Sequence, residues 1–344
     1  MKRNLILIAA MLFIMYTISI PLAADDVKIP KSALKLEKKG DAATKNKEYD
    51  KAMEFYKQAL EIYPDMETVH YKIASIHAFK KNFKESLDSL NATLKINNAN
   101  LNAKKALVDT TLKYGNSLLR NMKVEEANNL FINLASLEGL NEIDSKLATE
   151  LDYRIGFNYF QLRKPEESTV YLLKFINAPT AAELFPSFFP TAHYLLGLNY
   201  SQAEDSPNSN KYLNEFVDLT KDNPENKYIG FAKYIIGMNN FNILKEKIDK
   251  IEKAKNRENL DESNKKVLDL ANAETGVEPN LLYAIEKNPD LENAYVLLGN
   301  YYYLKKDLDN SIKYYQLLID KFPGSADIDV YKVFLKDIRK SKNR

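Results

Sequence analysis

The sequence has no cysteine and no tryptophan, and only three of its 344 residues are histidine. Without cysteine the chain can form neither disulfides nor thiolate metal sites, so its fold depends on its packed core alone, even in an oxidising compartment. His70 and His77 are two helical turns apart, but a metal site needs further ligands and a supporting shell around them. We therefore expect no metal and no cofactor.

An excess of either charge is also lacking, because 49 basic residues are balanced by 47 acidic ones. A nearly neutral chain is not steered to nucleic acid by its overall field, so we expect no nucleic-acid partner. The sequence contains no phosphate-cradling glycine loop, no G-x-S-x-G elbow and no H-E-x-x-H pair. Its acidic residues are scattered along charged segments, and we predict that the chain is not an enzyme.

The first residues have the order of an export signal. A lysine and an arginine precede an uncharged run at 5–20, which Pro21 and small residues follow. We predict a signal peptide at 1–24 that is cleaved after Ala24, then a linker at 25–31, and a periplasmic or extracellular protein. The alternative is an uncleaved membrane anchor, for which the run is short, since a span takes about 20 residues.

Glycine is rare as well, yet six of the ten glycines recur in one context, within an apolar helical segment. A glycine inside a helix costs about 1 kcal/mol relative to alanine, so its recurrence needs a shared cause. The simplest cause is a close approach of two helices, which a missing side chain permits. These glycines are Gly40, Gly115, Gly156, Gly197, Gly237 and Gly299.

A fixed pattern follows five of these six glycines, all except Gly237. A small residue comes twelve positions later, a large apolar one after four more, another apolar one after three more, and in two copies a closing proline. Such spacing places the residues on one helix face. Ala74 begins a further copy with the same offsets. The two fullest copies are Gly40, Ala52, Tyr56, Ala59 and Pro64, and Gly299, Ser311, Tyr315, Leu318 and Pro323.

These coordinated positions resemble the tetratricopeptide repeat family, whose 34-residue unit is a pair of antiparallel helices. The resemblance implies an all-α, right-handed superhelical solenoid of about seven or eight such pairs at 32–325. A C-terminal capping helix and basic tail follow at 326–344. Spacings of 40 or 41 in the middle copies predict longer turns there. The charged segment 243–291 is degenerate, and counting back from Gly299 places a weak copy near 258–291.

In proteins of this family, ligands lie on the concave wall formed by the first helices of the pairs, so the resemblance implies a partner-binding groove. This wall is aromatic and rich in amides. Lys45, Asn116 and Arg120 do not recreate the basic set with which some co-chaperones of the family hold a carboxylate. The groove residues are Tyr71, Phe79, Tyr153, Phe157, Phe160, Gln161, Tyr194, Leu198, Gln202, Asn300 and Tyr303.

Aromatic residues at such positions are good anchors for a partner, because they bury much area and lose little side-chain entropy. They are equally suited to fill the core between repeats, and the sequence leaves both interpretations open. An insert at 179–190 carries three phenylalanines. We expect them to cover the edge of the solenoid; the alternative is a second contact surface.

We predict an exported scaffold or adaptor that binds partner proteins or peptides in this groove, and analogy of fold suggests cell-envelope assembly. One alternative is a binder of a glycan, lipid or small molecule. Others are an enzyme with a site assembled across repeats and a subunit of a self-assembling structure. The sequence leaves the oligomeric state open. Membrane contact is expected only through an uncleaved signal segment or the basic tail.

Overall fold

The computed structural model describes residues 28–343, except for 224 and 255–259. The predicted signal peptide at 1–24 lies outside the described residues. Within the described part of the chain there are eighteen helices and no strand, so the prediction of an all-α fold is confirmed. The chain divides into two compact units, the first ending at Thr110 and the second beginning at Thr111.

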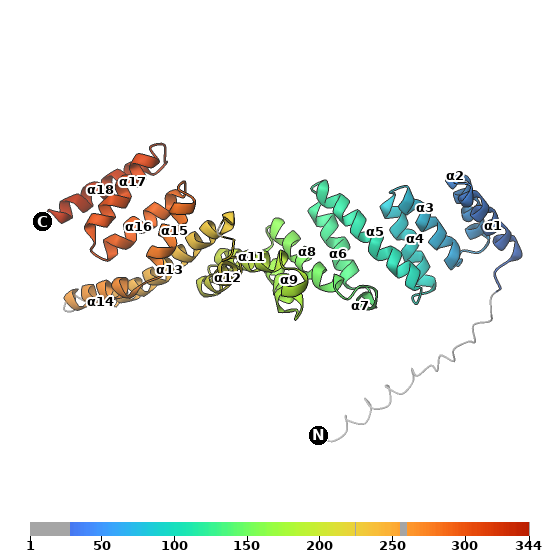
Figure 1. The fold of residues 1–344 in the computed structure, drawn as a ribbon, viewed down its shortest axis with the longest axis horizontal. Coiled ribbons are helices and arrows are strands. Elements are labelled where there is room, and N and C mark those ends of the chain that lie inside the picture. The colour runs from blue at the N-terminus through green and yellow to red at the C-terminus, as the bar shows by residue number, and fades with distance from the viewer. Residues whose placement is uncertain (1–27, 224, 255–259, 344) are drawn as a thin grey trace, which may run out of the picture. The chain divides into compact units, whose positions relative to one another are not determined.

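Unit 1 is built from two helix pairs and the start of a fifth helix, which continues into unit 2 (Figure 1). Its helices are α1 (Lys31–Lys45), α2 (Tyr49–Ile62), α3 (Glu67–Phe79), α4 (Phe83–Ile96) and the first half of α5 (Leu101–Arg120). Within the pairs, α1 packs along α2 and α3 packs along α4.

Unit 2 continues the pairing, with two four-residue helices inserted between pairs. Its elements after α5 are α6 (Val124–Ala135), α7 (Leu140–Ile143), α8 (Leu147–Gln161), α9 (Pro165–Asn177), α10 (Ala181–Leu184), α11 (Phe188–Gln202), α12 (Ser206–Leu219), α13 (Lys227–Lys253), α14 (Leu260–Ala273), α15 (Val277–Lys287), α16 (Glu292–Leu304), α17 (Leu308–Lys321) and α18 (Ile328–Lys342).

The recurring glycines lie where the two helices of a pair touch. A β-carbon on Gly197 would lie 2.4 Å from the side chain of Leu213, and one on Gly40 would lie 2.4 Å from the ring of Tyr56. Real β-carbons do not approach this closely, so only glycine fits here. The predicted cause of the recurrence, a close approach of two helices, is therefore present in the structure.

The small residue twelve positions after five of the six glycines also has a physical reason. In three copies it is a serine whose hydroxyl donates back to the carbonyl oxygen of the small residue in the first helix. The distance from Oγ to that oxygen is 2.8 Å for Ser209 and Gly197, and 2.9 Å for Ser311 and Gly299. The bond links the two helices of a pair at their closest point, where a larger side chain has no room.

The turn between the two helices of a pair contains a residue in the left-handed conformation. In six copies it lies seven positions after the small residue of the first helix, with φ between 57° and 62°. None of the six is glycine, although for other residues this conformation costs roughly 1 kcal/mol or more. The six are Lys47, Lys81, Met122, Arg163, Glu204 and Lys306.

Glycine at one of these turns should stabilise the protein. We expect Lys81→Gly to raise the free energy of unfolding of unit 1 by about 0.5–1 kcal/mol, because glycine relieves the left-handed strain. Lys57→Gly, the same change at an exposed position inside α2, should lower it by about 1 kcal/mol. Thermal unfolding followed by circular dichroism tests both variants. Equal losses in the two would contradict the assignment of strain at Lys81.

The segment 243–291 differs from the prediction of a weak copy near 258–291. Gly237 does not pack against a residue sixteen positions later; a β-carbon on it would instead lie 2.8 Å from the side chain of Leu281 in α15. The helix α13 runs past the point where the other copies turn, and α14 intervenes before α15 returns to pack along α13. The pair is thus α13 with α15, and α14 is an insertion within it.

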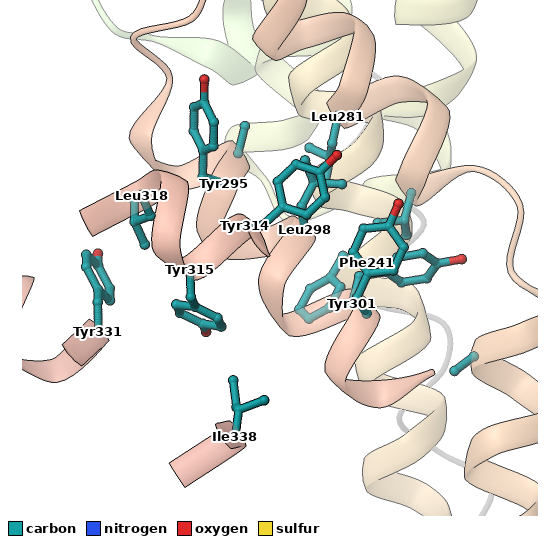
Figure 2. Packing of buried hydrophobic residues seen from close by; sticks show 14 of the residues in the cluster. Phe241, Leu281, Tyr295, Leu298, Tyr301, Tyr314, Tyr315, Leu318, Tyr331 and Ile338 are labelled. Atoms are coloured by element: carbon teal, nitrogen blue, oxygen red, sulfur yellow. The ribbon is translucent and has the colours of Figure 1, made fainter. Parts of the chain in front are cut away.

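The core of the C-terminal pairs is built largely from tyrosines (Figure 2). Tyr301, Tyr302, Tyr314 and Tyr315 are buried there, and Tyr302 stacks on Tyr314 with ring centroids 5.4 Å apart. Tyr301 keeps a partner for its hydroxyl, which donates to the carbonyl oxygen of Glu274 at 2.8 Å. Burial therefore leaves the polar end of this ring satisfied.

These buried rings predict a loss of stability at alkaline pH. Burial raises the pKa of Tyr56, Tyr194, Tyr301 and Tyr315 to about 12, whereas an unfolded tyrosine ionises near 10. Above pH 10 the folded state then binds more protons than the unfolded state, so stability falls as pH rises from about 10 towards 12. Melting temperatures measured across this range should decline as tyrosine absorbance at 295 nm rises. A constant melting temperature would contradict the burial of these hydroxyls.

Two further properties concern only the described part of the chain. No helix there combines the length and the apolar character that crossing a membrane requires. No group of three or more His, Asp or Glu side chains there is arranged to hold a metal ion.

Candidate functional site

Two adjoining hollows lie over helix α8 in unit 2, and they share the side chains of Phe157 and Gln161. We call their combined surface the α8 groove. One hollow, of about 610 Å³, is lined by Leu119, Met122, Val124, Tyr153, Arg154, Phe157, Asn158, Gln161 and Phe188. The other, of about 620 Å³, is lined by Phe157, Phe160, Gln161, Arg163, Pro165, Asn199 and Gln202.

A row of parallel aromatic rings forms one wall of the α8 groove. Tyr153 lies between Phe188, at a centroid distance of 4.4 Å and an interplanar angle of 4°, and Phe157, at 6.1 Å and 21°. Phe185 in turn stacks on Phe188, with ring centroids 6.0 Å apart and an interplanar angle of 6°. Tyr153 itself is only 9% exposed, so the wall is fixed by the core behind it. The α8 groove therefore presents a rigid apolar surface.

The insert at 179–190 supplies part of this wall. Phe185, Phe188 and Phe189 are half-buried and pack against the core around Phe175 and Tyr153. That packing agrees with the expected cover over the edge of the repeats. Phe188 also lines the hollow, so the same segment contributes to the contact surface.

Two buried amide atoms in the α8 groove have no hydrogen-bond partner. They are Nδ2 of Asn158 and Oδ1 of Asn199; each residue lines one of the two hollows, and each is only 2% exposed. Asn199 is held in place because its Nδ2 donates to Oγ of Ser168 at 2.9 Å. A buried polar atom without a partner costs roughly 1–3 kcal/mol, so this donor and this acceptor, behind the lining of adjoining hollows, need an explanation.

The α8 groove carries few charges, and those in its lining are positive. Arg154 and Arg163 are the charged residues among its lining. Arg154 is already engaged, since its guanidinium lies 2.6 Å from Oε1 of Glu150 and also donates to Oδ1 of Asn116. Burial raises the pKa of Tyr153, so its hydroxyl stays protonated and adds no charge. The lining therefore offers at most one uncompensated charge, that of Arg163, and this favours a partner with few charges at the point of contact.

The rim next to α6 is strained and apolar. Met122 is 84% exposed, although it is a large apolar residue, and it occupies the left-handed turn between α5 and α6. Leu119 and Val124 line the hollow beside it. A flexible thioether side chain adapts readily to the shape of a partner. Met122 therefore extends the apolar wall outward over the open side of the groove.

Five of the residues predicted for partner binding line the α8 groove together, and their position does not contradict that prediction. They are Tyr153, Phe157, Phe160, Gln161 and Gln202. Phe79 lies instead in a hollow of unit 1.

The remaining predicted residues lie elsewhere. Tyr194 is 9% exposed and packs against Phe216 and Tyr228, so it belongs to the core rather than to the groove wall, and Leu198 packs against the same core. The other three are half-buried: Tyr71 packs beside Leu90 in unit 1, Oδ1 of Asn300 accepts from the hydroxyl of Tyr315, and Tyr303 lies against Phe334 of α18.

The sequence interpretation missed the two orphan amides, although a signal for them exists. Asn158, Asn199 and Asn239 each stand two positions after a recurring glycine, in three consecutive copies. At Asn239 the partner is the serine of the preceding helix pair, since Nδ2 of Asn239 donates to Oγ of Ser209 at 2.9 Å. The equivalent position in α6 is Ala127, which has no hydroxyl to offer Asn158.

Comparison with known families matches two segments of the chain to models of the tetratricopeptide repeat, at residues 33–66 and 293–325. No curated protein matches the sequence. Among solved structures, the chain is similar to the C-terminal part of a tetratricopeptide repeat-containing protein from Cytophaga hutchinsonii. The identity is 13%, the match covers 85% of this chain and 97% of that one, and the TM-score is 0.43.

Two further solved structures are similar to this chain. One is YrrB, described as a tetratricopeptide repeat protein with an unusual peptide-binding site, at 20% identity over 56% of this chain and 88% of that one, with a TM-score of 0.31. The other is PilW, described as a widely conserved type IV pilus biogenesis factor, at 12% identity over 88% and 98%, with a TM-score of 0.32. This chain thus contains tetratricopeptide repeats at its two matched segments, and its other helices are also arranged largely in pairs.

Proposed function

We propose that the chain is an adaptor that binds a partner protein through an extended, weakly charged segment laid into the α8 groove. The observation that carries this proposal is the pair of orphan amide atoms on Asn158 and Asn199. One is a donor and the other an acceptor, which are the two groups that a peptide main chain needs as partners. A bound segment in extended conformation has both groups free, whereas a helix uses them internally.

The aromatic wall supports a peptide over a sugar. A sugar ring stacks on the face of an aromatic ring, but one face of Tyr153 is covered by Phe188 at 4.4 Å. Apolar side chains of a peptide need no free ring face. The two hollows, of about 610 and 620 Å³, can each accommodate one such side chain. Two or three such anchors at about 2 kcal/mol each, with the main-chain hydrogen bonds, suffice for a micromolar complex near −8 kcal/mol.

Selection from a displayed library of random peptides on the immobilised protein tests this function. We expect the enriched peptides to share two large apolar residues and to bind the Phe157→Ala protein much more weakly. Val170→Ser is the matched control, because Val170 is 53% exposed on α9 and lines neither hollow. Peptides that bind all three proteins equally would place the binding site elsewhere. Enrichment of no peptide would favour a glycan or lipid ligand.

We also propose that the protein acts after export, in the cell envelope or outside the cell. The support is the export-signal order of residues 1–24, which lie outside the described residues. N-terminal sequencing of the protein recovered from its own cells should begin at Asp25. A sequence beginning at Met1 would contradict cleavage and would favour the membrane-anchored alternative.

A further inference from the structure

A second hollow lies in unit 1, where the helices α1, α2 and α3 meet, and it is independent of the α8 groove. Its volume is about 380 Å³. We call it the unit 1 hollow. It is lined by Asp41, Thr44, Tyr49, Tyr56, Lys72, Ser75, Ile76 and Phe79.

The wall of the unit 1 hollow is a pair of aromatic rings, of which Phe79 is exposed and Tyr49 is half-buried. Phe79 ends α3 and is 68% exposed, the highest value among the aromatic side chains described as exposed. Its ring lies 4.9 Å from that of Tyr49, tilted by 42°. The open face of Phe79 gives the hollow an apolar surface that a partner can cover. The two rings are placed to receive the apolar part of another side chain.

The floor of the unit 1 hollow is a hydrogen-bonded cluster of charges. The hydroxyl of Tyr56 donates to Oδ1 of Asp41 at 2.8 Å. Nζ of Lys72 lies 2.8 Å from Oε1 of Glu37 and 2.9 Å from Oδ2 of Asp41. One ammonium group thus serves two carboxylates, and the cluster keeps one net negative charge. The side chain of Asp41 is 45% exposed, whereas that of Glu37 is 13% exposed, so Asp41 presents this charge to the hollow.

The protonation states of the cluster are fixed over the physiological range. Burial, with smaller contributions from Asp41, raises the pKa of Tyr56 to about 12, so its hydroxyl remains neutral. Burial alone would lower the pKa of Lys72, but its hydrogen bonds to Asp41 and Glu37 and their charges outweigh burial and raise it. Lys72 therefore stays charged and engaged, and it is not available to a ligand anion.

We propose that the unit 1 hollow binds a basic side chain, arginine or lysine, of a peptide partner. The aliphatic stem of that side chain packs against Phe79 and Tyr49. Its cationic head reaches the exposed carboxylate of Asp41 and lies near the ring faces, which attract cations. An acidic side chain would be repelled by the net negative charge of the cluster on the floor of the hollow. A purely apolar one leaves the Asp41 carboxylate covered without a counter-charge, which is unfavourable.

The test uses three short probe peptides that differ at one position: acetyl-Ala-Arg-Ala-amide and its norleucine and glutamate counterparts. Binding to the full-length, ¹⁵N-labelled protein is followed by chemical-shift changes at Thr44 and Ser75, both of which line the hollow. We expect the arginine peptide to bind at least fivefold more tightly than the norleucine peptide. The glutamate peptide should bind the most weakly of the three.

Two variants separate charge from shape. Asp41→Asn keeps an oxygen that accepts from the hydroxyl of Tyr56, and it should reduce the preference for the arginine peptide to less than twofold. Phe79→Ala changes an exposed position that the fold does not need. It should weaken the binding of both the arginine and the norleucine peptides. Phe157→Ala should change nothing at this site, so failure here is distinguishable from failure of the α8 groove. Equal binding of arginine and norleucine to the unaltered protein, or tighter binding of glutamate, would overturn the proposal.

Discussion

Replacing Gly197 with valine is expected to lower the free energy of unfolding of unit 2 by about 2–3 kcal/mol. Valine gains a little helix propensity over glycine, but its β-carbon would lie 2.4 Å from Cγ and 2.5 Å from Cδ2 of Leu213. Leu213 is fully buried, and its own backbone nitrogen lies 3.3 Å from the same point, so it cannot move aside without shifting α12. Chemical denaturation followed by circular dichroism measures the loss.

The matched control is Gly324→Val. Gly324 follows Pro323 in the turn before α18, and nothing lies within 4 Å of the β-carbon it would carry. We expect this variant to unfold within about 0.5 kcal/mol of the original protein. Adding Leu213→Ala to Gly197→Val should recover part of the lost stability, because the smaller side chain makes room for the new one. Independent, additive losses in the double variant would show that the two positions do not touch.

The second large effect concerns binding in the α8 groove. Phe157→Ala should weaken a selected peptide about 30-fold, which corresponds to about 2 kcal/mol, because Phe157 is the ring that both hollows share. Isothermal titration with one peptide against the original and the variant protein gives the ratio directly. Val170→Ser should leave the affinity within about twofold.

Asn158→Leu provides a sharper test, because stability and affinity should move in opposite directions. Leucine is of similar size and removes the buried, unpartnered Nδ2, so the melting temperature should stay the same or rise. The peptide should nevertheless bind at least tenfold more weakly, since the donor for its main chain is lost. A lower melting temperature with unchanged affinity would show that the amide serves the fold and not a ligand.

The helix pairs could be predicted from the sequence because the reason for each glycine is local. The partner of Gly197 stands sixteen positions along the chain, so one repeated spacing contains the whole contact. The wall of the α8 groove was expected from the resemblance to the tetratricopeptide repeat family, and Tyr153, Phe157 and Gln161 do occupy successive turns of one helix. Tyr194 shares the repeat position of Tyr153, but Tyr228 of α13 packs against its ring. A contact with the following repeat is not part of the periodic pattern.

The region after Gly237 shows the limit of periodicity most clearly. In other copies the position seven residues after the small residue is a turn, but here it is Leu244, which is buried inside a continuous α13. With the turn absent, the helix that completes the pair begins only at Val277. A 34-residue count therefore pairs the wrong helices, because it assumes that partners are neighbours in the sequence.

The central claim is that the α8 groove holds a segment of another protein, and site-specific photocrosslinking tests it most directly. Benzoylphenylalanine is introduced at Gln161, where both hollows meet, or at Val170 on α9 outside them, and the cells are irradiated intact. Adducts are then identified by mass spectrometry. We predict that Gln161→benzoylphenylalanine gives an adduct with one extended segment of one partner protein, and that Phe157→Ala abolishes it. The same adduct from Val170→benzoylphenylalanine, or an adduct at Gln161 that persists with Phe157→Ala, would contradict the claim.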